Sequence, residues 1–184
     1  MTNNPWKVID KEKIYENNWI ELNHFNVINP KGGDGVYGKV SFKNIAIGII
    51  PIDEDNNTWL VGQYRFPINK YSWEIPEGGC PLNTDPLTAA KRELLEETGL
   101  VAEEWKPILT MYLSNSVCDE FAIIFIAKNL TQENPQPEET EQLTIKKIKL
   151  EDAFKMVNTN EITDAVSIAA LQKLEIMMLK NEAI

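Results

Sequence analysis

The chain has 184 residues, and its 28 Asp and Glu residues outnumber its 18 Lys and Arg residues, which gives a formal net charge of −10. Hydrophobic residues make up 43% and charged residues 25%, as in an ordinary globular domain with room for a small appended unit. The acidic balance argues against nucleic acid as the main partner, because phosphate backbones are met by Lys and Arg patches.

Membrane and secretory roles are also disfavoured. No apolar run approaches the ~20 residues of a membrane span, and the first residues do not predict a secretory signal. Cys80 and Cys118 form no CxxC motif, so we expect no disulfide framework and a cytoplasmic location. The single histidine, His24, excludes a His-rich metal site and is interpreted as a half-exposed strand residue.

Alternating polarity over residues 19–28 predicts a half-buried strand, and a Gly-rich turn leads to a second strand at 36–42. The apolar run 45–51 predicts a strand covered on both faces, and we interpret it as a hairpin with 58–65. Further along, the pattern predicts a short extended piece at 73–76, a helix at 85–98, strands near 106–114, 120–128 and 143–150, and helices at 150–158 and 162–180. This order indicates an α+β fold with a mixed sheet flanked by helices, because regular βαβ units are missing.

The helix at 85–98 has clear end signals. Asp85 is a good N-cap, Pro86 suits the first helical position, and Gly99 suits the left-handed residue that closes a helix. At 100° per residue, Leu87, Ala90 and Leu94 form one apolar stripe that can face a core.

Three glutamates lie beside that stripe. Glu93 and Glu97 are four residues apart, and like charges at this spacing cost a helix about 0.2–0.5 kcal/mol per pair unless a cation lies between them. Oxygen ligands suit Mg²⁺ or Mn²⁺, Glu96 can join the group, and Arg92 can hold one carboxylate in place. A strand, a turn and a helix with a solvated acidic face remains the alternative at this point.

The run from Gly78 to Leu100 resembles the Nudix box, in which a glycine and a distant Arg-Glu-x-x-Glu-Glu-x-Gly segment are fixed in spacing. The matching residues are Gly78, Arg92, Glu93, Leu94, Glu96, Glu97, Gly99 and Leu100. Thr84 stands where the family pattern has a glutamate. The resemblance implies the α/β/α sandwich of Nudix hydrolases.

Further segments resemble the ADP-ribose pyrophosphatase branch of that family. They are Gln63-Tyr64-Arg65, Trp73-Glu74-Ile75-Pro76 and the stretch 162–171, whereas Ser114-Asn115-Ser116 departs from the Ser-Pro-Gly often found there. The resemblance implies an N-terminal β subdomain, residues 1–43, that exchanges between the protomers of a homodimer. Residues 44–184 would then form the hydrolase domain.

The same resemblance implies a set of site residues. Metal ions would be held by Glu93 and Glu97, with Glu96 assisting and Glu77 completing the shell. Catalysis would use a base on the acidic loop 131–142, Glu139 first and Glu141 second, together with Arg92 and Glu96. Substrate would be bound by Arg65, Glu74, Trp19, Glu120 and Gly78. Four of these assignments have a plainer alternative: a surface ion pair for Arg65, a core aromatic residue for Trp19, a strand-edge residue for Glu120 and a solvated loop for the acidic segment.

The implied reaction is metal-dependent hydrolysis of ADP-ribose to AMP and ribose 5-phosphate. Two alternatives stay open. The first is a Nudix hydrolase for another nucleotide sugar, such as GDP-mannose, or for a dinucleotide. The second is a domain that senses a nucleotide without turning it over, although the intact glutamate cluster disfavours it.

Overall fold

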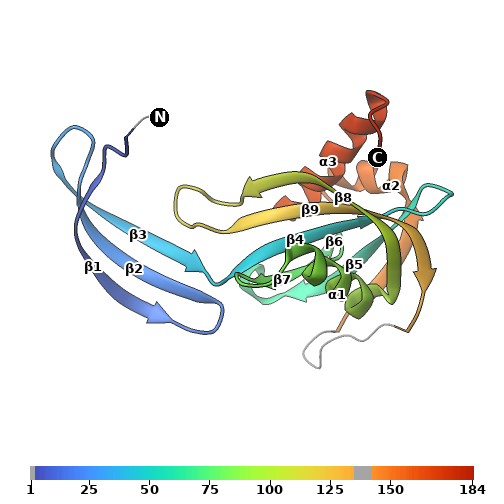
Figure 1. The fold of residues 1–184 in the computed structure, drawn as a ribbon, viewed down its shortest axis with the longest axis horizontal. Helices are drawn as coiled ribbons and strands as arrows, with labels where there is room; N and C mark the ends of the chain where they lie inside the picture. The colour runs from blue at the N-terminus through green and yellow to red at the C-terminus, as the bar shows by residue number, and fades with distance from the viewer. Residues whose placement is uncertain (1–2, 135–141) are drawn as a thin grey trace.

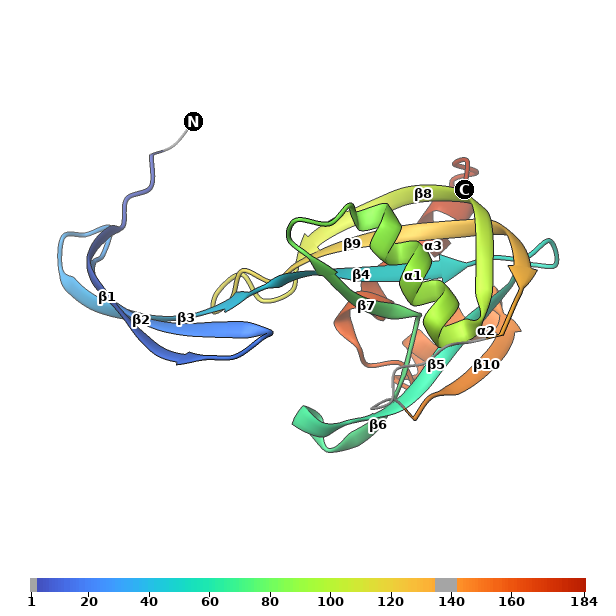
Figure 2. The ribbon, with the colours of Figure 1, turned by 60° about the horizontal axis from the view of Figure 1, so that its bottom comes forward.

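The computed structural model describes residues 3–134 and 142–184, and within them the chain forms ten β-strands and three α-helices (Figures 1 and 2). The strands are β1 Lys7–Glu16, β2 Ile20–Ile28, β3 Asp34–Phe42, β4 Asn44–Pro51, β5 Asn57–Arg65, β6 Lys70–Glu74, β7 Glu77–Pro81, β8 Leu100–Tyr112, β9 Phe121–Gln132 and β10 Thr144–Lys149. The helices are α1 Pro86–Thr98, α2 Leu150–Asn158 and α3 Ala165–Leu179, and a 3-10 turn covers Phe66–Ile68.

The first three strands form a separate antiparallel sheet in the order β1-β2-β3. Figure 1 shows it standing apart from the rest of the molecule, with β3 running directly into β4. The loop between β8 and β9 reaches back to β3: Val40 donates its N–H to the Val117 carbonyl, and Lys39 pairs with Asp119 at 2.6 Å. The boundary proposed after residue 43 falls between these two strands, and the division into subdomains remains a prediction.

The body of the protein contains two further sheets, ordered β7-β4-β9-β8 and β10-β5-β6. The four-stranded sheet is mixed, because β4 runs parallel to β9 while its other pairings are antiparallel. Helix α1 lies on one side and α2 and α3 on the other (Figure 2). This arrangement confirms the predicted α+β fold with helices flanking mixed sheets.

Two apolar cores hold these layers together. Ile47 and Ile49 of β4 are fully buried on the α1 side, where Leu94 also packs. Ile50 of the same strand belongs to the second core, beneath α2 and α3. Strand β4 is therefore covered on both faces, as its continuous apolar run predicts.

Helix α1 begins and ends as its sequence predicts. The Asp85 carboxylate accepts the Thr88 N–H at 2.9 Å, and Gly99 adopts φ 72° and donates its N–H to Leu95. Ala90 and Leu94 are buried, and Leu87 packs against the same core.

The strands differ from the expectations in several places. Residues 45–51 and 58–65 do not form a hairpin, because β4 pairs with β7 and β9 whereas β5 pairs with β10 and β6. Strand β1 was not predicted, because its charged sequence shows no clean alternation of polar and apolar residues. Its extended structure comes from pairing with β2. Strand β7 was not predicted either, because the extended piece was expected to end at residue 76. The strand at 106–114 begins earlier than expected, directly after Gly99.

No helix in the described ranges, 3–134 and 142–184, is long and apolar enough to cross a membrane.

Candidate functional site

The glutamates of α1 face strand β7 and bind its backbone. Glu93 accepts the Gly79 N–H at 3.1 Å, and Glu97 accepts the Glu77 N–H at 3.0 Å. Glu97 is only 3% exposed. Because the helix places these carboxylates one turn apart, both reach the same short strand, and each satisfies a backbone donor there.

Gly78 makes this approach possible. A Cβ atom built at this position would lie 2.1 Å from the Glu93 carboxyl carbon, which is far inside any allowed contact. Here glycine is required for close packing and not for an unusual backbone angle. This contact does not test the predicted role of Gly78 in substrate binding. It shows that Gly78 leaves room for the carboxylate of Glu93.

Arg92 bridges two of the glutamates. Its guanidinium donates to Glu93 at 2.6 Å, to Glu96 at 2.5 Å and to the Gly79 carbonyl at 3.0 Å. Burial raises the pKa of Glu93, and Arg92 opposes that rise. Arg92 therefore connects the helix to β7 and orients the acidic face.

A second arginine organises the other side of β7. Arg65, at the end of β5, binds Glu74 through Nε and through Nη2 at 2.6 Å, and Nη2 also reaches Glu77 at 2.9 Å. Burial by itself would lower the pKa of Arg65, but the ion pairs with Glu74 and Glu77 raise it. Glu74 is buried while the Arg65 side chain is 38% exposed, so this ion pair is partly shielded from water.

Glu120 and Asp164 bring further negative charge to this region. Burial raises the pKa of Glu77 well above its ordinary value, and the charges of Asp164 and Glu74 raise it further. Burial and the charge of Asp164 also raise the pKa of Glu120. Glu77 and Glu120 thus each lie within electrostatic reach of Asp164, although the three residues come from distant parts of the sequence.

The chemistry of these donors fits a hard divalent cation. The acidic side chains of the region outnumber its two arginines: they are Glu74, Glu77, Glu93, Glu96, Glu97, Glu120 and Asp164. Buried carboxylates in excess of their counter-ions are costly, and a cation removes that cost. Among residues 3–134 and 142–184, however, no three His, Cys, Asp or Glu side chains already lie grouped to hold a metal. Arg65 and Arg92 hold several of these carboxylates in ion pairs, so side-chain rotation would have to accompany binding.

Other predicted residues lie elsewhere or outside the description. Trp19 is 64% exposed at the junction with the N-terminal sheet, where its carbonyl accepts the Lys43 N–H. No ring contact or hydrogen bond within the described residues joins it to the glutamates of α1. Glu139 and Glu141, the predicted bases, lie outside the described residues.

Sequence reasoning missed residues at the start of α3. Asp164 caps this helix by accepting the Ser167 N–H at 2.7 Å, and the buried Ser167 hydroxyl accepts the Ile75 N–H at 3.0 Å. These bonds fasten α3 to the chain segment between Glu74 and Glu77. The capping pattern Asp-x-x-Ser before an apolar run could have revealed the helix start, but not its position against β6.

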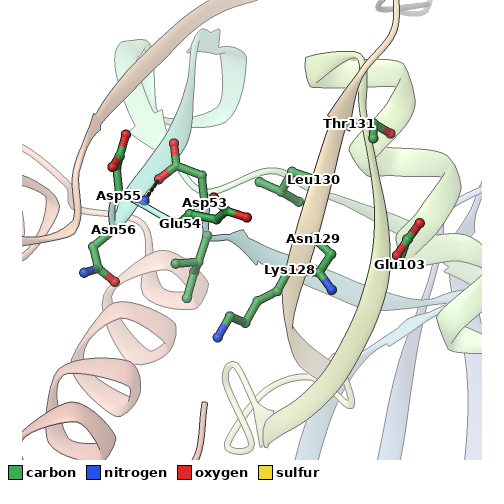
Figure 3. Close-up of a pocket in the computed structure, with 10 residues that line it drawn as sticks. Asp53, Glu54, Asp55, Asn56, Glu103, Lys128, Asn129, Leu130 and Thr131 are labelled. Carbon is green, nitrogen blue, oxygen red and sulfur yellow. Dashed lines mark hydrogen bonds between the residues drawn. The ribbon is translucent and has the colours of Figure 1, made fainter.

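One hollow on the surface lies away from this site. A cavity of about 760 Å³ lies between the β4–β5 turn and strands β8 and β9 (Figure 3). Asp53, Glu54 and Glu103 line it together with Lys128, and none of the α1 glutamates does. Figure 3 shows these side chains spread around an open space instead of converging on one point.

The fold and the acidic face of α1 indicate a class of protein, and comparison with known families identifies that class. A family model described as the NUDIX domain matches residues 42–171, and the chain belongs to this family. Members of this family are hydrolases that generally need a divalent metal.

Similar proteins extend over nearly the whole chain. The ADP-ribose pyrophosphatase of Bacillus subtilis (strain 168) is 31% identical over 177 residues, with 92% of each chain covered. The methanol dehydrogenase activator of Bacillus methanolicus is 28% identical, again with 92% of each covered. A solved structure described as that of an ADP compounds hydrolase has a TM-score of 0.86 and 19% identity over 100% of both chains, which shows a shared fold.

Proposed function

We propose that this protein hydrolyses the diphosphate bridge of a nucleoside diphosphate sugar, with ADP-ribose as the preferred substrate. The observation that carries the proposal is the pair of carboxylates, Glu93 and Glu97, anchored to the β7 backbone by the Nudix box. The similarity to an ADP-ribose pyrophosphatase along the full chain supports the choice of substrate.

In the reaction a water molecule attacks one phosphorus, the bridging P–O bond breaks, and AMP and ribose 5-phosphate leave. A divalent metal, when bound, would lower the pKa of the water and neutralise the diphosphate, which a protein of charge −10 otherwise repels. We assign its ligands to Glu93 and Glu97, with Glu96 and Glu77 completing the shell, and propose Mg²⁺ as the ion, with Mn²⁺ able to replace it.

The arginines have separate roles in this proposal. Arg92 holds Glu93 and Glu96 in the orientation that binding requires. Arg65 binds both Glu74 and Glu77 through Nη2, and its Nη1 group, which no hydrogen bond occupies within the described residues, is the part of the fork left for a phosphate oxygen. Glu120 lies close enough to Asp164 to face the same substrate.

Release of AMP tests the activity. Purified protein with Mg²⁺ should cleave ADP-ribose faster than GDP-mannose, UDP-glucose or diadenosine triphosphate, when each is assayed for its nucleoside monophosphate. If ADP-ribose ranks far below another nucleotide sugar, the substrate assignment is wrong while the hydrolase assignment stands. If no compound in the panel is cleaved, a domain that senses nucleotides without turnover becomes the better interpretation.

The base that takes the proton from water is proposed to be Glu139, with Glu141 as the second choice. Glu139→Gln should lower turnover strongly and leave the affinity for Mn²⁺, measured by calorimetry, unchanged. If Glu141→Gln is much the more damaging substitution, the two roles must be exchanged.

We also propose that the protein works in the cytoplasm as a homodimer joined through residues 1–43. Both described cysteines, Cys80 and Cys118, are free thiols, which suits a reducing compartment. The N-terminal sheet exposes large apolar side chains that a second copy would cover; they are Trp6, Val8, Ile9, Ile14, Tyr15, Trp19 and Val36. Sedimentation over a range of concentrations tests the dimer.

A further inference from the structure

The loop between β8 and β9, residues 113–120, lies between the N-terminal sheet and the acidic site. Figure 1 shows it reaching back to the junction of β3 and β4. At its base the Leu113 N–H donates to the Glu120 carbonyl at 3.1 Å, and near its tip the Ser114 carbonyl accepts the Cys118 N–H at 2.9 Å. These internal bonds hold the loop together as one unit.

One side of this loop is bound to β3. Val40 donates its N–H to the Val117 carbonyl at 2.9 Å, and its own carbonyl accepts the Asp119 N–H at 3.2 Å. The Tyr37 hydroxyl donates to the Ser116 carbonyl at 2.8 Å. The loop is therefore attached to the N-terminal sheet by main-chain bonds and by a side chain.

The Asp119 side chain binds the point where the chain passes from the N-terminal sheet into the body. Its Oδ1 atom accepts the Phe42 N–H at 2.9 Å, and its Oδ2 atom pairs with Lys39 at 2.6 Å. Phe42 is the last residue of β3, and Lys43 alone separates it from β4. A single chain connection lets a sheet turn about the residues that join it, whereas a second attachment fixes its angle.

The other side of the loop brings Glu120 to the acidic site. Ala122 and Ile124 of β9 pack in the core beneath α2 and α3, and Glu120 precedes them at the same two-residue spacing. Glu120 is therefore on the α3 side of β9. It lies near Asp164, the N-cap of α3, whose charge adds to burial in raising the pKa of Glu120. Consecutive residues, Asp119 and Glu120, thus connect β3 and the acidic site.

We propose that Asp119 is a positioning residue for substrate binding, because its bonds to β3 fix the place of Glu120 in the acidic site. Substrate binding then depends on the angle at which the N-terminal sheet is held. This inference rests on the proposed hydrolysis of a nucleoside diphosphate sugar, in which Glu120 faces the substrate. Asp119 acts through Glu120 and takes no part in the bond-breaking step.

The first test is kinetic and uses the full-length protein with Mg²⁺ and ADP-ribose, or the nucleotide of the panel that is cleaved fastest. For Asp119→Ala we expect KM to rise about fivefold and kcat to change by less than about twofold, because binding is impaired while the metal ligands stay in place. Asp119→Asn keeps an oxygen for the Phe42 N–H and loses only a partly exposed ion pair, so KM should rise by less than about twofold. A wild-type KM in Asp119→Ala would overturn the proposal.

A double-mutant cycle shows whether Asp119 acts through Glu120. We expect Glu120→Ala to raise KM, and adding Asp119→Ala to it should raise KM by no more than about twofold further, because the group being positioned is gone. A purely structural role for Asp119 predicts that the two increases multiply. Multiplied increases, or a wild-type KM in Glu120→Ala, contradict the proposed positioning.

Two further variants give a second perturbation and a control. Tyr37→Phe removes the bond to the Ser116 carbonyl and loosens the same attachment without changing Asp119. It should raise KM about twofold, and it decides the question if Asp119→Ala does not fold. Asp34→Ala is the matched control, because Asp34 is an exposed aspartate at the opposite end of β3. Its KM should equal that of the wild type, and a rise as large as in Asp119→Ala would refute a role specific to Asp119.

Binding measurements separate this proposal from the hydrolase activity. The dissociation constant of the same nucleotide, measured by calorimetry with Ca²⁺, should rise in Asp119→Ala by about the same factor as KM. A wild-type protein that binds the nucleotide but releases no AMP refutes the hydrolase activity, while the dissociation constants of the variants still decide the role of Asp119. Variants that bind and cleave as the wild type does leave the hydrolase standing and refute the positioning role. If no nucleotide of the panel binds, both proposals are wrong.

Discussion

The N-terminal sheet and the body of this protein use apolar residues in opposite ways. In the body, Ile47, Ile50 and Leu94 are fully buried between layers, so that part of the chain makes its own core. In the N-terminal sheet every residue of β1 is exposed, and only Asn23 and Val27 of β2 are buried. The comparison shows that the body contains the buried apolar layers, whereas the N-terminal sheet leaves its large apolar side chains exposed.

The largest expected effect is on catalysis within the body. Glu97→Gln should reduce kcat for AMP release by about 10³-fold or more, because an amide holds a divalent cation far more weakly than a carboxylate. Circular dichroism should show an unchanged fold. Glu103→Gln, which changes an exposed glutamate on β8, is the control and should keep wild-type turnover. Near wild-type activity in Glu97→Gln would refute the metal assignment.

The next effect concerns the core. Leu94→Ala removes a fully buried side chain and should lower the free energy of unfolding by about 2–5 kcal/mol in urea titrations. Ile14→Ala on β1, where the side chain is 54% exposed, should change it by less than about 0.5 kcal/mol for the dissociated chain. Equal losses at the two positions would mean that the N-terminal sheet has a core of its own.

A charged residue introduced on the exposed N-terminal sheet should weaken the proposed dimer. Ile14→Asp is expected to raise the dimer dissociation constant about tenfold or more, since it places a charge within an apolar contact. Sedimentation equilibrium measures the change. Ile145→Asp offers the matched control, because Ile145 is an exposed isoleucine on β10 in the body. If both variants dissociate equally, the interface does not lie on the N-terminal sheet.

The smallest effect is at the β4–β5 turn, far from both features. Burial alone would raise the pKa of Asp53, but Lys147 and Asn57 more than offset this and lower it below its ordinary value. A depressed carboxyl pKa stabilises the fold above the unfolded-state pKa near ~4, and this contribution is lost as pH falls further. Asp53→Asn should cost about 1 kcal/mol at pH 7, and urea titrations should show this cost shrinking only as pH falls below about 4 towards the lowered pKa of Asp53 in the folded state. Asp55→Asn, which changes an exposed residue of the same turn, is the control and should change the free energy of unfolding at pH 7 by less than about 0.5 kcal/mol.

Local signals were enough to predict α1 and its ends, because Asp85, Pro86 and Gly99 act through neighbouring atoms alone. The apolar run of β4 likewise predicted that both faces of this strand are buried. Strand pairing was harder, since β4 and β5 follow each other in sequence but belong to different sheets. The sequence of residues 44–65 does not indicate which distant strands will pair with β4 and β5.

The site divides in the same way. Spacing on one helix was sufficient to bring Glu93, Glu96 and Glu97 together, and the family pattern supplied Arg92. Asp164 and Ser167 were not found, because their position beside the segment from Glu74 to Glu77 depends on how α3 packs against the end of β6. Gly78 was predicted to allow a ligand to approach, and what approaches it in the structure is the protein's own Glu93.

That contact ties the chemistry to the integrity of the whole body. Glu93 reaches the Gly79 N–H only while α1 and β7 are pressed together, and Ala90 and Leu94 on the same helix are what press them. Loosening the core therefore disperses the carboxylates before the helix itself unravels. The rate of turnover therefore depends on the packing of the core. It should be lost at the denaturant concentration at which water first enters the core.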